Sequence, residues 1–249
     1  MSIASSGLTA AREMAVNDAL TLLSSGTLRI EGRLIDASNT TLYCSASLDA
    51  VDAACVYKPA IGERPLWDFP DGTLGRREVA AYELSTATGW RIAPPTVYRD
   101  GPLGPGMAQL WIDVDEAVDV VALLRGRSDQ LRRMAVFDVV INNADRKGGH
   151  VLPTRSGHLY GVDHGVSFHV DPKLRTLLWQ WAGEPLPDDS MDTLRSLRGA
   201  LNGDLADRLH QLLTNREVRR TMRRIDLLLA SGRHPWPSGN RPAIPWPPM

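Results

Sequence analysis

The sequence predicts an α+β protein whose first half is rich in β-strands and whose second half is mainly helical. Three β-rich runs separated by turn residues fill 27–59, as in an antiparallel meander. A threonine start and a glycine stop favour a helix over 74–88. From residue 128 onward, helical patterns occupy 128–142 and 188–231. A sheet followed by helices predicts a compact fold of two packed lobes, with the helix of 74–88 against the sheet.

The first half can be divided into elements by its turn residues. An amphipathic helix is expected within 1–26, where a Ser-Ser-Gly run ends it. The meander of 27–59 and an irregular loop lead to the helix of 74–88. Two further strands are expected within 94–100 and 106–114, on either side of a Gly/Pro turn.

The second half begins with a linker-like stretch expected at 113–127. Ser128 is placed to cap the helix that follows. The run 149–162 has the pattern of a hairpin, and helices are expected over 188–231. Six prolines in 233–249 exclude a helix or a central strand there. That segment is expected to be either a tail without fixed structure or an arm packed on the protein. The expected division is an N-terminal lobe of 1–112, a C-terminal lobe of 113–232 and the proline-rich tail of 233–249.

Composition restricts the partners. A net charge of −1 argues against a broad nucleic-acid-binding surface. The chain contains no apolar run long enough for stable membrane insertion, so a cytoplasmic protein is expected. Cys44 and Cys55 lie in strand-like segments without metal-type spacing, and we expect them to be reduced, half-buried core residues.

A lysine and a glutamate are placed as a phosphate-binding site requires. Phosphoryl transfer needs a cation on a rigid strand, and an acid that orients the cation. Lys58 ends the third strand of the meander, with Val56 on the same face. Glu78 lies on the following helix, where Glu83 is the competing candidate. Taken alone, a lysine at a strand end is more often solvated, and a helical glutamate is more often exposed.

Two aspartates lie at the ends of apolar runs in the second half. Asp145 follows the helix of 128–142 in a polar loop, and Asp163 follows a strand and precedes a His-Gly turn. The hairpin between them brings both to the same end of the lobe. Either aspartate alone is a common turn residue. Their combination favours a metal site or a phosphoryl-transfer site.

These motifs resemble a known family. The stretch "NNADRKGGHVL", followed by "GVDHG", resembles the catalytic loop and metal-binding turn of the phosphatidylinositol 3- and 4-kinase superfamily. The type II phosphatidylinositol 4-kinases are the most similar, and the chain also resembles a small actinobacterial branch related to them. The other matching motifs are Tyr57-Lys58-Pro59, then Glu78, Ile92, Pro94 and Thr96, and finally Trp181-Ala182. The resemblance covers 27–187.

The resemblance implies a kinase-like fold and an ATP-dependent phosphotransferase that uses Mg²⁺ or Mn²⁺. Lys58 would hold the ATP phosphates and Glu78 would orient Lys58. Asp145 would be the catalytic aspartate and Asp163 the principal metal ligand. The full set of implied site residues is Lys58, Asp145, Arg146 and Lys147 for catalysis; Ser38, Asn39, Val56, Lys58, Glu78, Gln109, Leu110, Trp111 and Ile112 for the nucleotide; and His150 and Asp163 for the metal. Within this set, Lys147 would stabilise the transferred phosphoryl group, unless it is simply a solvated lysine.

The sequence departs from the family pattern in two places. His150 stands where the family has a metal-binding asparagine. Imidazole suits borderline metals better than Mg²⁺, so we expect a preference for Mn²⁺, or one metal held through Asp163 alone. The turn "DASNT" contains no glycine, so side chains such as those of Ser38 and Asn39 would have to help bind phosphate.

The acceptor hydroxyl is expected on a protein or a small molecule. Only Lys173 and Arg175 supply cations in the segment after the metal-binding turn, whereas a phosphoinositide kinase would gather more basic charge. We therefore rank protein Ser/Thr phosphorylation, including autophosphorylation, above lipid phosphorylation. A nucleotide-binding pseudokinase that acts as a scaffold is the main alternative. A metal-dependent hydrolase built on His150, Asp163 and His164 is a weaker one.

Overall fold

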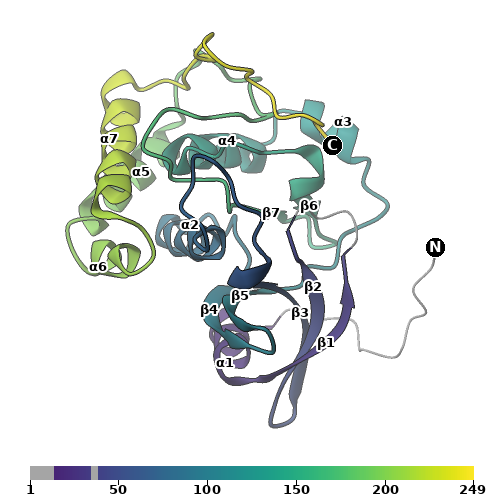
Figure 1. Cartoon of the computed structure of the whole chain (residues 1–249). Coiled ribbons are helices and arrows are strands. Elements are labelled where there is room, and N and C mark those ends of the chain that lie inside the picture. Colours follow the sequence, from purple (N-terminus) through teal and green to yellow (C-terminus); the bar gives the residue numbers. More distant parts are fainter. Residues whose placement is uncertain (1–13, 35–38) are drawn as a thin grey trace.

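The computed structural model describes residues 14–34 and 39–249, and it has the predicted α+β architecture. A five-stranded antiparallel sheet in the order β1-β2-β3-β5-β4 forms the first lobe, and the second lobe is mostly helical (Figure 1). The strands are β1 (Thr27–Arg33), β2 (Leu42–Leu48), β3 (Val51–Pro59), β4 (Thr96–Gly101) and β5 (Gly104–Leu110). The predicted α+β fold, with a β-rich first lobe and a mainly helical second lobe, is confirmed.

The sheet has one face covered by helix α1 (Val16–Ser25). Leu22 and Leu23 of α1 pack with Tyr57 of β3 in the core of this lobe. The expected helix within 1–26 is therefore present from Val16; residues 1–13 lie outside the described part of the chain. The other face of the sheet looks toward the second lobe, and the site residues on β3 point that way.

The two cysteines lie in this core. Cys44 and Cys55 are opposite each other in the register of β2 and β3, and both are free thiols. Both are completely buried rather than half-buried as expected. Their burial follows from the face of the sheet that α1 covers.

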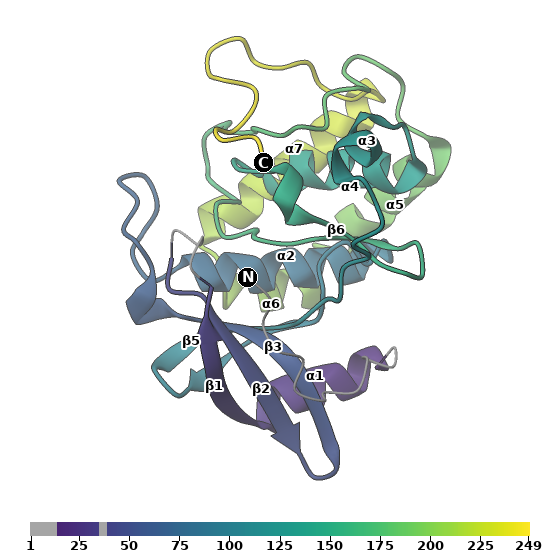
Figure 2. The ribbon, with the colours of Figure 1, turned by 90° about the vertical axis from the view of Figure 1, so that its right-hand side faces the viewer.

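Helix α2 (Leu74–Thr88) has the predicted bounds. Gly89 ends it in the left-handed conformation, at φ 69°, which glycine adopts without steric cost. The helix runs between the sheet and the helices of the second lobe (Figure 2), and most of its residues are buried. It contacts β4 and β5 on one side and the second lobe on the other.

The second lobe is built from helices and one hairpin. The helices are α3 (Val120–Arg125), α4 (Asp129–Ile141), α5 (Asp188–Ala200), α6 (Asp204–His210) and α7 (Asn215–Ser231), and the hairpin strands are β6 (Val151–Pro153) and β7 (Leu159–Gly161). Short 3-10 turns η1 (Ala60–Gly62) and η2 (Gly148–His150) complete the elements. As predicted, the Ser128 hydroxyl accepts a hydrogen bond at the start of α4.

The prediction of a continuous linker at 113–127 was wrong, because α3 lies within it. Asp119 caps this helix by accepting hydrogen bonds from the backbone N–H groups of Val121 and Ala122. An aspartate directly before an apolar run is a helix-start signal. The sequence therefore contained the cue for this short helix.

The proline-rich segment 233–249 is an arm packed on the second lobe. Both the backbone N–H of Thr176 and the indole N–H of Trp179 donate to the carbonyl oxygen of Ala243 at 3.0 Å. The N–H of Gly148 donates to Pro248 O at 2.8 Å. The arm therefore reaches from α7 across the lobe to the loop that precedes β6 (Figure 1). Within the described residues, no helix is both long and apolar enough to cross a membrane.

Candidate functional site

Lys58 lies at the centre of the candidate site, near the end of β3. Its neighbour Tyr57 points into the sheet core and is fully buried, so alternation directs Lys58 to the opposite face. There its Nζ donates to Glu78 Oε1 at 2.7 Å and to Asp163 Oδ1 at 2.8 Å. Strand β3, helix α2 and the turn after β7 therefore meet at one ammonium group. Glu83, the competing candidate, pairs instead with Arg208 at 2.7 Å.

The charged groups at this junction shift one another's pKa values. Burial alone would lower the pKa of Lys58, but the carboxylates of Asp163 and Glu78 raise it overall, so the ammonium stays charged. Burial raises the pKa of Glu78 to about 6, although Lys58 opposes the shift. Glu78 Oε2 is buried and accepts no hydrogen bond from the part of the chain that the structure describes. The junction therefore keeps one acceptor oxygen for a further donor.

Asp163 faces both Lys58 and His150. It has φ 59°, a left-handed conformation that aspartate tolerates better than most residues. Its Oδ2 lies 3.4 Å from His150 Nε2, and its side chain is 45% exposed. Lys58 lowers the pKa of Asp163 below its usual range, against the effect of burial. Asp163 is therefore a partly exposed anion beside Lys58.

His150 is a neutral imidazole in this arrangement, because burial lowers its pKa. Its Nδ1 accepts a hydrogen bond from the backbone N–H of Lys147 at 3.5 Å. That bond assigns the ring proton to Nε2, which faces Asp163. Coordination of a metal through Nε2 would require the proton to move to Nδ1, with loss of the Lys147 hydrogen bond.

Asp145 lies in the loop after α4 and is 23% exposed. Its backbone N–H donates to the Asn143 side-chain oxygen at 3.0 Å, which fixes the loop locally. Its carboxylate lies 3.2 Å from Lys147 Nζ. The two residues expected to face the acceptor therefore form an ion pair at the mouth of the site.

Arg146, predicted as a catalytic residue, is 0% exposed and has no access to a substrate. Its guanidinium pairs with Asp138 of α4 at 2.9 Å. It also contacts His164 Nε2 at 2.7 Å and donates to Val162 O at 3.2 Å. Arg146 therefore joins the loop that carries Asp145 to the turn that carries Asp163, and its role in catalysis stays a prediction.

Asp138 holds the other end of this network and was missed by sequence reasoning. Its carboxylate accepts from Asn143 Nδ2 at 3.0 Å and from Thr176 Oγ1 at 3.1 Å, besides the bonds from Arg146. A buried charge is tolerated only when paired and hydrogen-bonded. The available cue was an aspartate inside the apolar run "VFDVV".

His164 belongs to this buried network and is 0% exposed. Burial lowers its pKa well below the usual value, and the neighbouring Arg146 lowers it further. The neutral ring accepts a hydrogen bond from Arg146. Over 14–34 and 39–249, no three His, Cys, Asp or Glu residues are grouped to hold a metal ion. The proposed third ligand of a hydrolase centre thus points elsewhere.

Two backbone amides in the segment expected to contact adenine, Gln109 to Ile112, take part in hydrogen bonds of the sheet. The N–H of Leu110 donates to Pro95 O at 2.9 Å, and the N–H of Trp111 donates to Ala54 O at 3.0 Å. Both amides are therefore used by the sheet. Half-buried Trp111 and Ile112 are the positions in this segment that follow β5.

The remaining nucleotide-side residues are placed as follows. Gln109 is buried, and its side-chain amide donates to Thr96 Oγ1 at 2.8 Å, so it supports the strands. Val56 is half-buried, on the face of β3 that carries Lys58. Asn39 Oδ1 accepts from the Arg64 backbone N–H at 2.7 Å. Ser38 lies outside the described residues.

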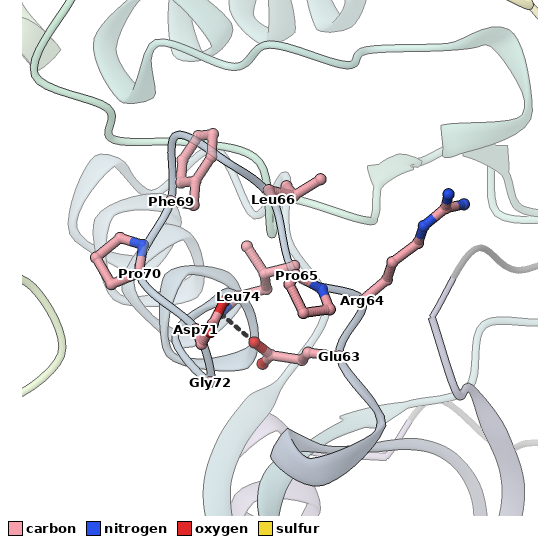
Figure 3. A pocket seen from close by; sticks show the side chains of 9 residues that line it. All are labelled: Glu63, Arg64, Pro65, Leu66, Phe69, Pro70, Asp71, Gly72 and Leu74. Carbon is pink, nitrogen blue, oxygen red and sulfur yellow. Dashed lines mark hydrogen bonds between the residues drawn. The ribbon is translucent and has the colours of Figure 1, made fainter.

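The loop between η1 and α2 encloses a small recess beside the site (Figure 3). Glu63 points to the start of α2, where its carboxylate accepts from the N–H groups of Leu74 and Gly75 at 3.0 and 2.8 Å. The recess holds about 10 Å³, room for about one water molecule. We interpret it as a helix-capping loop and not as a ligand site.

Comparison with known proteins shows the family. No family model matches the chain. Protein Rv2133c of Mycobacterium tuberculosis is 44% identical over 266 aligned residues, which cover 93% of this chain and 95% of that protein. The chain therefore belongs to the same family as protein Rv2133c. Phosphatidylinositol 4-kinase gamma 4 of Arabidopsis thaliana is 29% identical over 135 residues, which cover 51% of this chain and 24% of the plant kinase.

Solved structures share the fold. Two structures of the Golgi casein kinase superpose with TM-scores of 0.58 and 0.57, the second with Mn/ADP bound. Each is 14% identical and covers 87% of this chain and 75% of the kinase. At this identity the likeness concerns the fold alone. The chain thus combines a kinase-like fold with distant sequence similarity to a phosphatidylinositol 4-kinase.

Proposed function

We propose that this protein is an ATP-dependent phosphotransferase that acts on a hydroxyl acceptor. The observation that carries the proposal is Lys58, held at 2.7 Å from Glu78 and 2.8 Å from Asp163. A lysine–glutamate pair beside a metal-binding aspartate is the arrangement that positions and neutralises ATP phosphates. Distant similarity to phosphatidylinositol 4-kinase gamma 4 and the kinase-like fold support it.

Each residue at the cleft has a role in this proposal. Lys58 exchanges its contact with Asp163 for a phosphate oxygen, while Glu78 keeps the ammonium in place. Asp145 orients or deprotonates the acceptor hydroxyl, and Lys147 balances charge on the transferred phosphoryl group. Arg146 contributes by fixing the relative position of the two loops.

A divalent ion fits the residues on one side of the cleft. Asp163 offers an exposed carboxylate, and His150 offers a neutral imidazole beside it. When bound, such an ion would neutralise phosphate charge. One carboxylate plus one imidazole is a donor set that favours Mn²⁺ over Mg²⁺. The Golgi casein kinase, whose structure was solved with Mn/ADP, shares the fold.

We rank a protein or small-molecule hydroxyl above a lipid headgroup as the acceptor. Lys173 is 6% exposed, and it pairs with Asp68 of the loop before α2. Arg175 Nε donates to Ala144 O at 2.8 Å. The two cations that follow the metal-binding turn therefore have structural partners, which leaves less charge for an anionic headgroup.

A nucleotide-binding pseudokinase is the second candidate. Both carboxylate oxygens of Asp163 are already engaged, one by Lys58 and the other by His150. If these contacts persist with nucleotide, Asp163 cannot hold a metal. Binding would then occur without phosphoryl transfer.

Incubation with γ-labelled ATP and either Mn²⁺ or Mg²⁺ tests the proposal. Mixed-lipid vesicles, a Ser/Thr peptide library and the protein itself serve as acceptors in separate reactions. We expect label on the protein or on peptides, faster with Mn²⁺. Label on lipid would support the phosphotransferase function but would rank a lipid headgroup above a protein or small molecule as the acceptor. Nucleotide binding with no labelled product under any condition would support the pseudokinase.

A further inference from the structure

Helix α2 is built into the second lobe, although it precedes the last two strands of the sheet in the chain. Ala80, Ala81 and Leu84 belong to the same hydrophobic core as α4, α5, α6 and α7. The core of the sheet, as far as the described residues show, contains no residue of α2. Glu78 therefore lies on a helix whose apolar side chains pack into the second lobe, although α2 also contacts β4 and β5 of the sheet. Lys58 reaches Glu78 and Asp163 from the sheet.

Arg77, the residue before Glu78, fixes this helix in two directions. It is 2% exposed. One guanidinium nitrogen donates to Ser167 O at 2.8 Å, and the other pairs with Glu217 Oε1 at 2.5 Å. Ser167 follows Asp163 closely in the chain. A single side chain thus ties α2 both to the segment after the metal-binding turn and to α7.

Glu217 gives Arg77 a rigid anchor. Its second carboxylate oxygen accepts from the backbone N–H of Thr214 at 2.9 Å and from the hydroxyl of Thr214 at 2.8 Å, a capping box at the start of α7. Phe69 lies under the guanidinium, 4.8 Å from ring centroid to Cζ. A planar guanidinium group that is bound at two points keeps a fixed geometry. The contacts of Arg77 therefore set the rotation of α2 about its axis and its position relative to the second lobe.

We propose that Arg77 is a positioning residue that keeps Glu78, and through it Lys58, in register with Asp163. The ion pair is then assembled without any swing of α2. The kinetic part of this inference rests on the proposed phosphotransferase function, whereas its structural part does not.

Lysine acylation tests the structural part without requiring activity. The sequence contains three lysines, Lys58, Lys147 and Lys173, so each can be followed by mass spectrometry after brief treatment with an amine-acylating reagent. Lys58 is 15% exposed and held by two carboxylates. It should react slowly, and Lys147 serves as the internal reference. Loosening of α2 releases Lys58 and raises the ratio of Lys58 to Lys147 acylation.

The informative variant is Arg77→Leu combined with Glu217→Gln. It removes both anchors without leaving a buried carboxylate unpaired, and glutamine can still accept from Thr214. We expect the acylation ratio to rise by about fivefold or more. The KM for ATP should rise by a similar factor while kcat falls less, because Asp145 is untouched. Glu217→Gln alone keeps the Ser167 contact and should give a smaller rise.

The matched control is Arg133→Leu with Asp189→Asn, which removes an exposed ion pair at 2.6 Å in the same lobe. Its acylation ratio and KM should equal those of the unchanged protein. The inference is overturned if the folded Arg77 variant, checked by circular dichroism, also behaves like the unchanged protein. If the Lys58 to Lys147 acylation ratio rises in the Arg77 variant but the unchanged protein transfers no phosphate, the positioning role of Arg77 is supported and the phosphotransferase function is rejected.

Discussion

Two charged clusters, Arg146 with Asp138 and Lys58 with Glu78 and Asp163, differ in how far they are buried and hydrogen-bonded. The pair of Arg146 and Asp138 is 0% exposed, and its carboxylate is bonded on both oxygens. At the cleft, Asp163 is 45% exposed, and Glu78 Oε2 has no partner among the described residues. The first cluster holds two loops together, and the second keeps unsatisfied groups for a ligand. Complete burial of the Arg146–Asp138 pair thus separates the scaffold from the partly exposed site.

The largest expected effect comes from breaking the scaffold cluster. Asp138→Ala leaves the Arg146 charge buried without a partner, which should lower the free energy of unfolding by about 3–5 kcal/mol. Urea unfolding followed by circular dichroism measures it. The control is Asp189→Ala, which removes an exposed partner of Arg133 and should cost at most about 1 kcal/mol. Equal losses in the free energy of unfolding for Asp138→Ala and Asp189→Ala would contradict the distinction between a buried and an exposed ion pair.

Removal of the cleft cation should affect activity more than stability. Lys58→Met is expected to reduce phosphoryl transfer by about 10²–10³-fold, the range seen when one charge-stabilising group is lost. The free energy of unfolding should change by less than about 1.5 kcal/mol, because Glu78 can take up a proton once the cation is gone. Parallel rate and unfolding measurements on Lys58→Met and Lys147→Met give the comparison. If Lys58→Met lowered the free energy of unfolding as much as Asp138→Ala, Lys58 would have a structural role like that of Asp138.

The pH dependence of folding should arise in the interior of the second lobe. Burial and Arg132 lower the pKa of His234 to about 4, so the native state keeps it neutral. The unfolded state takes up a proton below the usual value of about 6.5, hence stability falls as pH drops through that range. By pH 4 the loss from this group is up to about 3 kcal/mol. In thermal unfolding, the His234→Gln variant should lack this part of the dependence of stability on pH. An unchanged pH dependence would exclude His234 as its source.

The smallest effect concerns metal preference. His150→Asn replaces an imidazole with an oxygen donor, so the ratio of activity with Mg²⁺ to activity with Mn²⁺ should rise, by about tenfold. His158→Asn is the control, since His158 lies in the turn of the hairpin and its ring contacts Arg91 O. Should both variants keep the original ratio, His150 would have no part in metal binding.

Local patterns in the sequence predicted the elements that carry the site. The bounds of α2, the meander, the hairpin and the cap at Ser128 all follow from periodicity and turn residues. Strand alternation and the position of the next helix predicted that Lys58 meets a glutamate of α2, and the family resemblance selected Glu78 over Glu83. These features depend on neighbours in the chain, which is why they could be read in advance.

Features that depend on tertiary packing were not predicted. Asp138 looked like a residue of an ordinary amphipathic helix, and its bonds to Arg146 and Thr176 exist only once distant segments pack. The same holds for Arg77, whose partners Ser167 and Glu217 are far along the chain. The amides of Leu110 and Trp111, two residues expected near adenine, donate to Pro95 and Ala54 only once the sheet has formed. Sequence motifs identified the residues near the ligand better than the residues that support them.

The most direct test of the central claim is a label-transfer assay with γ-labelled ATP and Mn²⁺ on the unchanged protein and on Asp145→Asn. Asp145 has no role in the scaffold beyond its loop, so circular dichroism and unfolding should be the same for both proteins. The proposal predicts labelled acceptor or labelled protein with the unchanged chain and a loss of about 10²-fold or more with the variant. Equal transfer by both proteins, or binding of ATP without transfer by either, would contradict it.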